Sequence, residues 1–374
     1  MKKVLLVAHK IRFFVQFELN DIKLLQELGD EVHVASNYKS EEMIVDSYDK
    51  LTSMNVKVHQ VDFERSPLHF IKNKKALNQL TDIIRTNGYE FIHCHTPVGG
   101  VLARIAGKQT KIKVIYTAHG FHFYKGAPLK NWLLFYPVEW LCAHWTDTLI
   151  TINKEDYALA QKHMHAKKVE YIPGVGLDID KFKNCSVDRA ENRKELGIGE
   201  EDIAILSVGE LNDNKNHQVV INALAKLQNN KLHYLIAGQG ENKDKLIKLA
   251  NDLGLAKNVH LLGYRSDINE LCKSADIYVL PSIREGLNVS LMEAMASGLP
   301  CVASEIRGNT DLIDEDGGEL FNPHDVDDCK NAIETVLSKD LNKLGNYNQE
   351  KINQFDKITV IEEMKKIYYE IGEK

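Results

Sequence analysis

Two glutamates in one short stretch are the first residues of this chain that could do chemistry. The stretch PSIREGLNVSLMEAMASGLP runs from Pro281 to Pro300, and Glu285 and Glu293 lie eight positions apart in it. Glu285 precedes Gly286 in a predicted loop, whereas Glu293 falls inside a short helical pattern. Carboxylates accept hydrogen bonds from hydroxyl groups. Two of them beside a phosphate site would suit a ligand with hydroxyls on both sides of its phosphates, such as a sugar nucleotide.

The same stretch offers a place for the phosphates. A helix N-terminus carries unpaired N–H groups and a partial positive charge, so it binds phosphate. The turn GLNVS feeds the predicted helix SLMEAMASG, and Lys215 would add a full positive charge. Together they predict a diphosphate site that requires no metal. A structural alternative is a capping box, because Glu293 lies three residues after Ser290.

Two α/β domains must position these residues. Short apolar runs such as KVLLVAH, IAILSVGE and DIYVLPS alternate with longer helical patterns along the whole chain. Such runs are typical of parallel strands that helices cover on both faces. Pro173, Gly174 and Gly176 cluster between two rounds of this pattern and indicate a domain boundary. We expect Rossmann-like, doubly wound domains at 1–172 and 173–358, and a helix at 359–374 that packs back toward the first domain.

Ligands of an open parallel sheet bind outside the carboxyl ends of its strands. The residues after each predicted strand are therefore the candidate site. In the first domain they include His9, Lys10 and His119. In the second domain they are Gly209, Glu210, Lys215, Gly238, Gly263, Tyr264, Arg265 and the loop from Pro281 onward.

Composition excludes several other functions. The formal net charge of -6 disfavours a nucleic-acid binder. The six cysteines are scattered without zinc-site spacing. We expect His93 and His95 to face opposite sides of a strand, and so not to form a metal pair. The GQG at 238–240 lacks the third glycine of a dinucleotide fingerprint, which disfavours an oxidoreductase.

No predicted segment suits membrane insertion or export. The apolar run in MKKVLLVAHKIR is too short for a signal peptide and lacks a cleavage site. A membrane helix needs about 20 apolar residues. The nearest candidate, 132–145, is interrupted by Pro137, Glu139 and His144. We therefore expect a cytoplasmic protein.

The ordered motifs resemble those of the retaining glycosyltransferases of family GT4, which have the GT-B fold. EGLNVSLME resembles the family's E-x7-E motif, and TAHG, SVGELNDNKN, AGQGE and LLGYRSDI stand in the family's order. The resemblance covers nearly the whole chain. YTAHGFHFYKGAP, TINKEDY and YIPGVGLD make the chain similar to bacterial capsular and exopolysaccharide glycosyltransferases.

The resemblance implies roles for individual residues. Glu293 would bind the ribose, Glu285 would face the donor sugar, and His119 would reach that sugar from the first domain. Lys215 would neutralise the diphosphate, which places His119, Glu285 and Lys215 in the catalytic set. The implied donor site comprises Gly209, Glu210, Lys215, Gly238, Gly263, Tyr264, Arg265, Glu285, Gly286, Leu287, Asn288, Val289 and Glu293.

Two departures from the family bear on these roles. Many members carry an arginine where this chain has Glu210, so we expect Lys215 to supply more of the charge, with Arg265 or Arg284 as candidate substitutes. Many also have a Gly-Gly loop where this chain has HKIRFFVQF. The candidate acceptor contacts are His9, Lys10, Arg12, Phe121, His122 and Lys125. Core aromatics with solvated lysines would explain the same residues.

The predicted function is retaining transfer of a sugar from a UDP-sugar, with an N-acetylhexosamine as one candidate. The implied acceptor is a polyprenyl-diphosphate-linked saccharide in capsule or exopolysaccharide assembly. We therefore expect peripheral association with the cytoplasmic face of the inner membrane, and neither a cofactor nor a metal. The alternatives are a UDP-N-acetylglucosamine 2-epimerase-like enzyme and a non-catalytic nucleotide-sugar binding protein. Glu285, Lys215 and His119 argue against the non-catalytic module.

Overall fold

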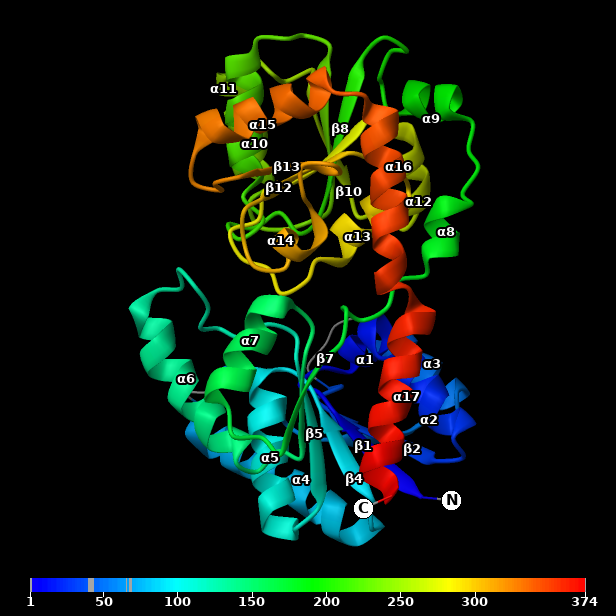
Figure 1. Cartoon of the computed structure of the whole chain (residues 1–374), viewed down its shortest axis with the longest axis vertical. Coiled ribbons are helices and arrows are strands. Elements are labelled where there is room, and N and C mark those ends of the chain that lie inside the picture. The colour runs from blue at the N-terminus through cyan, green and yellow to red at the C-terminus, as the bar shows by residue number, and fades with distance from the viewer. Residues whose placement is uncertain (1, 40–43, 65, 67–68, 374) are drawn as a thin grey trace. The chain divides into compact units, whose positions relative to one another are not determined.

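A computed structural model describes residues 2–39, 44–64, 66 and 69–373 of the chain. The chain divides into two compact units, which are Met1–Gly176 with Lys357–Lys374 and Leu177–Asp356. We call them unit 1 and unit 2. The chain thus passes between the units four residues beyond the predicted boundary at 172 and returns at Lys357, two residues before the predicted final helix. Figure 1 labels the elements of both units.

Unit 1 is built on a seven-stranded parallel sheet with the strand order β3-β2-β1-β4-β5-β6-β7. The strands are β1 (Lys3–Val7), β2 (Glu31–Ser36), β3 (Lys57–Gln60), β4 (Phe91–Cys94), β5 (Lys113–Ala118), β6 (Thr148–Thr151) and β7 (Lys168–Tyr171). The helices are α1 (Ile11–Phe17), α2 (Leu19–Glu27), α3 (Ile44–Ser53), α4 (Phe70–Asn87), α5 (Pro97–Thr110), α6 (Leu129–Ala143), α7 (Lys154–His163) and α17 (Lys357–Glu373).

Both faces of this sheet are covered, which explains its continuously apolar strands. In β1, Leu5 and Val7 pack with residues of α4, α5, α6 and α7, whereas Val4 and Leu6 pack with α1, α2, α3 and α17. Successive side chains of a strand point to opposite faces. A strand that lies between two helical layers therefore needs apolar residues at every position.

Unit 2 is built on a six-stranded parallel sheet with the order β10-β9-β8-β11-β12-β13. The strands are β8 (Ile203–Val208), β9 (Leu232–Ala237), β10 (Val259–Gly263), β11 (Ile277–Leu280), β12 (Cys301–Ser304) and β13 (Gly318–Phe321). The helices are α8 (Ile179–Lys183), α9 (Arg189–Glu195), α10 (His217–Leu227), α11 (Lys243–Asp252), α12 (Ile268–Ser274), α13 (Val289–Ala296), α14 (Asn309–Leu312), α15 (Val326–Ser338), α16 (Leu341–Lys351) and a 3-10 turn (Ile352–Phe355). The predicted α/β class, with two Rossmann-like sheets, is confirmed.

The last helix, α17, completes the core of unit 1 (Figure 1). Its buried residues pack with α1 and α2, and the hydroxyl of Tyr368 donates a hydrogen bond of 2.9 Å to Asp21. Where the chain leaves unit 1, position 176 requires a glycine. Its φ is +79°, and a Cβ there would lie 2.9 Å from the Cα of Lys357. Within the described residues, no helix combines the length and apolar composition needed to cross a bilayer.

Candidate functional site

The best place for a ligand in unit 2 is the edge where β8 and β11 lie side by side. The chain leaves β8 toward β9 and β10, but leaves β11 toward β12 and β13. Ligands of open parallel sheets bind at such a reversal of the strand order, outside the carboxyl ends of the strands. The loop after β8 carries Lys215, and the loop after β11 carries Glu285.

Lys215 and Glu285 meet at this edge in an ion pair. The Nζ of Lys215 lies 2.7 Å from Oε1 of Glu285, and their side chains are only 18% and 14% exposed. Hydrogen bonds fix both loops. The side chain of Asn212 accepts from the backbone N–H of Lys215 at 3.0 Å, and the side chain of Asn214 donates to the carbonyl of Arg284 at 3.0 Å. The sequence thus identified two residues that the fold brings into contact across 70 positions.

Helix α13 begins shortly after Glu285 in the sequence, and the residue that caps its N-terminus differs from our expectation. Asn288 is the N-cap, and its side-chain oxygen accepts a hydrogen bond of 3.0 Å from the N–H of Leu291. The capping box of Ser290 and Glu293 is therefore wrong. Ser290 is already inside the helix, and its hydroxyl lies 3.1 Å from the carbonyl oxygen at the end of β8. Glu293 is thus not engaged in capping.

Glu293 is half-buried on α13. Burial raises the pKa of its carboxyl group to about 7, and Lys181 on α8 partly opposes this shift. A carboxyl group with a pKa near neutrality titrates in the range where enzymes work, and such groups concentrate at functional sites.

The glycines at these strand ends serve close packing of the backbone. A Cβ at Gly238 would lie 1.8 Å from the carbonyl oxygen of Gly209, and one at Gly308 would lie 1.9 Å from that of Gly286. Gly238 also donates a hydrogen bond of 2.7 Å to the carbonyl of Gly263. These glycines are therefore required to bring the loops together, whatever ligand binds there.

The expected substitutes for the family's missing arginine are otherwise engaged or exposed. Arg265 forms an ion pair with Asp267, in which its Nε donates at 2.8 Å, and Arg284 is exposed. The sequence missed Arg307, whose buried side chain donates from Nε to the carbonyl oxygen of Glu285 at 3.1 Å. Arg307 follows β12, so the same strand-end rule could have found it. Tyr264, which the resemblance places near the base, is 76% exposed.

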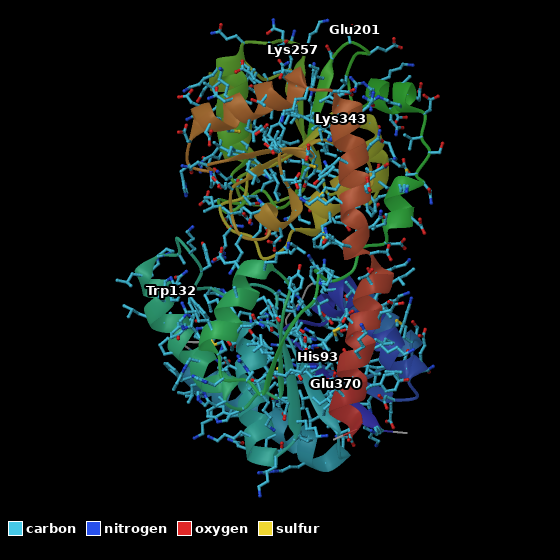
Figure 2. The ribbon with its side chains drawn as sticks, viewed as in Figure 1. His93, Trp132, Glu201, Lys257, Lys343 and Glu370 are labelled. Carbon is cyan, nitrogen blue, oxygen red and sulfur yellow. The ribbon has the colours of Figure 1, made fainter. Side chains whose placement is uncertain are left out.

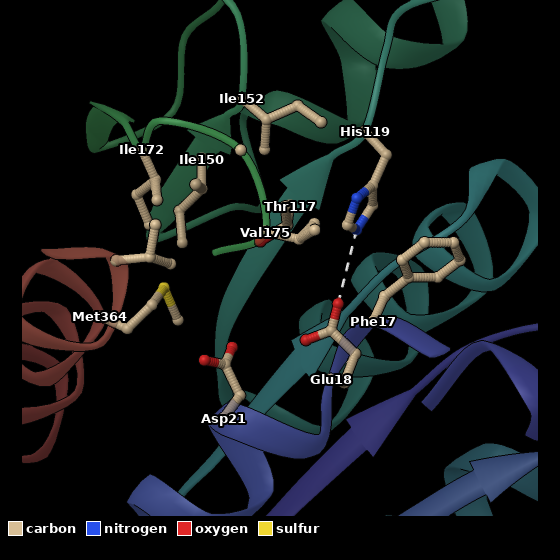
Figure 3. Close-up of a pocket in the computed structure, with 12 residues that line it drawn as sticks. Phe17, Glu18, Asp21, Thr117, His119, Ile150, Ile152, Ile172, Val175 and Met364 are labelled. Atoms are coloured by element: carbon tan, nitrogen blue, oxygen red, sulfur yellow. Dashed lines mark ion pairs between the residues drawn. The ribbon is translucent and has the colours of Figure 1, made fainter. Parts of the chain in front are cut away.

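In unit 1, His119 belongs to a cluster that the sequence only partly indicated. His119 follows β5, and its Nε2 lies 3.2 Å from Nδ1 of His95 and 3.7 Å from Oε1 of Glu18 (Figure 3). Glu18 lies between α1 and α2, and its Oε1 is 3.4 Å from Nδ1 of His95. The ring centroid of Phe13 lies 5.1 Å from that of His119 and 5.3 Å from that of His95.

Burial keeps this cluster close to neutral. It lowers the pKa of His119 to about 4 and that of His95 well below its ordinary value, and it raises the pKa of Glu18 well above its ordinary range. A neutral carboxyl group can donate a hydrogen bond to a neutral imidazole. The cluster therefore presents His119 without net charge to the pocket that Glu18, Asp21, Thr117, His119 and several apolar residues line in unit 1 (Figure 3).

The expectation for His93 and His95 was wrong. Residues two apart on a strand share a face, and the two rings lie 4.2 Å apart. His93 instead contacts the hydroxyls of Tyr368 at 2.9 Å and Thr117 at 2.8 Å. Among the described residues, the group close enough to share an ion is Glu18, His95 and His119.

The candidate acceptor residues of unit 1 fall into three classes. Lys10, Arg12 and Lys125 are exposed. Phe121 is only 3% exposed and stacks on Phe123 at 4.9 Å, so its ring belongs to the core. His9 and His122 are partly buried. The ring of His122 lies 4.6 Å from that of Phe135 on α6.

Comparisons with known proteins agree with this geometry. Residues 188–353 match the family model described as glycosyl transferases group 1, and residues 3–153 match glycosyl transferase 4-like. A Bacillus subtilis protein with the provisional name of glycosyltransferase EpsD is 38% identical, over 98% of this chain and 96% of its own. The chain belongs to the group 1, GT4-like glycosyltransferases.

Two further relatives of this glycosyltransferase are informative. The UDP-Gal:alpha-D-GlcNAc-diphosphoundecaprenol alpha-1,3-galactosyltransferase of Escherichia coli is 30% identical over 81% of both chains. The crystal structure of Anabaena Alr3699/HepE in complex with UDP-glucose superposes with a TM-score of 0.80, at 20% identity, over 99% of this chain and 100% of that one. The second likeness shows that the two chains share the GT-B fold.

Proposed function

We propose that this glycosyltransferase transfers a sugar from a UDP-sugar to a polyprenyl-diphosphate-linked saccharide, with retention of anomeric configuration, in capsule or exopolysaccharide assembly. The observation that carries the proposal is the Lys215–Glu285 pair beside the N-terminus of α13 at the switch point of unit 2. The substrates in the name of the Escherichia coli relative and the UDP-glucose of the Anabaena structure support the choice of donor and acceptor.

The proposed reaction breaks the bond between the sugar C1 and the oxygen of the diphosphate. The bonding electrons leave with UDP, and positive charge develops on the sugar. Lys215 and the N–H groups of Asn288 and Val289 stabilise the departing phosphate, and such preorganised groups usually supply the largest catalytic contribution. The acceptor hydroxyl attacks from the same face, and its proton passes to the leaving phosphate. No metal ion takes part.

The remaining residues of the site are proposed to orient the donor. Glu285 accepts hydrogen bonds from the sugar hydroxyls, Glu293 accepts them from the ribose, and Tyr264 lies by the base. His119 of unit 1 contacts the donor sugar as a neutral imidazole. On the acceptor side we propose His9, Lys10, Arg12, His122 and Lys125, with the enzyme peripheral at the cytoplasmic face of the membrane.

Affinity for UDP is expected to fall as the pH is lowered through 7. Glu293 accepts two hydroxyl hydrogen bonds only when ionised, and its pKa is about 7 in the free protein. Between pH 8 and pH 6 its ionised fraction falls about tenfold, so the Kd for UDP should rise up to about tenfold. Calorimetry across this range tests the expectation. Glu293→Gln should bind weakly with a flatter profile, and an equally steep profile in the variant would assign the titration to another group.

Glu18 is expected to act as a neutral partner that positions His119. Because burial raises the pKa of Glu18, Glu18→Gln keeps a neutral hydrogen-bonding group and should retain kcat within about threefold. Glu18→Leu removes that group and should lower kcat by at least about tenfold, with little change in the UDP affinity of unit 2. Steady-state kinetics of both variants measure the difference. Equal losses in both would show that an ionised carboxylate is required.

A donor panel separates the transferase from its alternatives. UDP release is measured with UDP-, GDP- and ADP-sugars, with and without a lipid-diphosphate saccharide. A transferase should release UDP from one UDP-sugar, faster with acceptor. An epimerase should convert UDP-N-acetylglucosamine without any acceptor, and a non-catalytic module should bind UDP without turnover; either result would overturn the proposal.

A further inference from the structure

Helix α6 of unit 1 exposes large apolar side chains along its whole length. These are Leu129, Leu133, Leu134, Val138, Trp140 and Leu141. Leu129 and Leu133 are 72% and 71% exposed, which is unusual for leucines in a folded domain. The helix continues through Pro137, so these residues form one rigid surface. A contiguous apolar surface of this kind marks an interaction site.

Both halves of α6 are largely apolar, unlike those of an ordinary surface helix. At about 100° per residue, the six exposed apolar residues fall on one half of the helix together with Lys130 and Pro137. We call this half the α6 outer face. The opposite half packs on the protein and holds the only carboxylate of the helix, Glu139, which is buried and pairs with Arg104 at 2.8 Å. An amphipathic surface helix normally turns its charges outward.

Charge and length indicate what this surface contacts. Every residue of 125–144 is described, and the exposed charged residues among them are Lys125 and Lys130, with no exposed acid. Trp140 packs on His144 at 4.6 Å near the other end of the helix. Cationic and Trp side chains around an apolar face suit the interface of an anionic bilayer. Fifteen residues span about 22 Å, short of the roughly 30 Å hydrocarbon core, so the helix would lie in the interface.

Helix α6 adjoins the proposed acceptor residues within unit 1 through its inner half. The side chain of Asn131, in the first turn of α6, donates a hydrogen bond of 2.9 Å to the carbonyl of His122. The ring of His122 lies 4.6 Å from that of Phe135 on the same helix. Trp132, which Figure 2 labels, contacts Phe123 beneath this segment, with ring centroids 5.5 Å apart. A bilayer at the outer face would thus bring a lipid-linked acceptor to these residues.

We infer that the α6 outer face inserts into the interfacial region of an anionic bilayer and holds the enzyme where its lipid-linked acceptor lies. The inference rests on the proposed function for that acceptor. The bilayer binding itself depends only on the apolar residues and lysines of this face.

The test is flotation with vesicles of phosphatidylglycerol and phosphatidylethanolamine. The variant Leu133→Gln with Leu134→Gln keeps good helix formers and removes two leucines from the face. It should lower the vesicle partition coefficient at least about tenfold. The matched control is Ile247→Gln with Leu253→Gln in unit 2, where the exposed fractions are 42% and 38%. The control should bind as the wild type does, and phosphatidylcholine vesicles should bind the wild type more weakly.

Two further measurements separate the outcomes. The double leucine variant should transfer sugar normally to a short-chain, water-soluble acceptor, yet lose at least about tenfold in rate on a full-length polyprenyl acceptor in vesicles. Unchanged flotation of the variant would overturn the inference. A dimeric wild type and a monomeric variant in light scattering would also overturn it, because the α6 outer face would then join two copies of the chain. Vesicle binding through this face without any sugar transfer would uphold the inference and refute the proposed function.

Discussion

Lys215→Met is expected to lower kcat for sugar transfer by about 100- to 1,000-fold, which is the effect of removing one electrostatic contact to a developing negative charge. The reason lies in the composition of the site. Glu210 occupies the position where the family often carries an arginine, and Arg265 is paired with Asp267. The proposed mechanism therefore assigns to Lys215 most of the positive charge that stabilises the departing UDP. Initial rates at saturating donor measure the effect.

The controls for this variant follow from its ion pair. Lys215→Met leaves Glu285 without its cation, so part of any loss could come from instability. The double variant Lys215→Met with Glu285→Gln removes both charges, and it should regain thermal stability without regaining activity. Lys245→Met, which breaks an exposed pair with Asp213, should change neither property. If the double variant regained kcat, neither charge would be needed for sugar transfer, and the proposed roles of both Lys215 and Glu285 would be wrong.

Glu285→Gln is expected to lower kcat/KM for the donor by about 30- to 100-fold while the Kd for UDP changes less than about threefold. Glu285 is proposed to contact the sugar and not the nucleotide, so free UDP should not sense the change. A charge-assisted hydrogen bond strengthened in the transition state contributes about 2–3 kcal/mol, which corresponds to this factor. Calorimetry with UDP and kinetics with the UDP-sugar measure the two quantities separately.

The matched control for Glu285→Gln is Glu334→Gln, on the exposed surface of α15, which should behave as the wild type does. A loss of UDP affinity as large as the loss of kcat/KM would contradict the assignment of Glu285 to the sugar. It would place the carboxylate at the nucleotide, or show that it acts only by fixing Lys215.

The sequence predicted the parts of this molecule that depend on local pattern. Strands such as β1, β8 and β11 were found because two-sided burial demands an apolar residue at nearly every position. Lys215 and Glu285 were found because ligands bind where parallel strands end, and the structure brings their side chains to 2.7 Å. The assignment of Lys215 and Glu285 to the donor site stays a prediction until the variants are measured.

Other features were missed because they depend on tertiary contacts, and one prediction was wrong because the period of a strand was misapplied. Asn288 caps α13, whereas the Ser290 hydroxyl instead hydrogen-bonds to the carbonyl oxygen at the end of β8. His93 and His95 were misplaced, although period-two geometry puts residues two apart on one face. Glu18 could not be found from local pattern, because it meets His95 across 77 positions of the chain.

The product of the wild-type enzyme shows whether it carries out the proposed retaining transfer. The enzyme is incubated in EDTA with the UDP-sugar that the donor panel selects and a polyprenyl-diphosphate-linked saccharide, and the lipid product is examined by mass spectrometry and proton NMR. The account predicts that the acceptor gains one sugar with the donor's anomeric configuration, with one UDP released for each sugar transferred. An inverted linkage, a requirement for metal, or UDP release without any glycosylated lipid would contradict it.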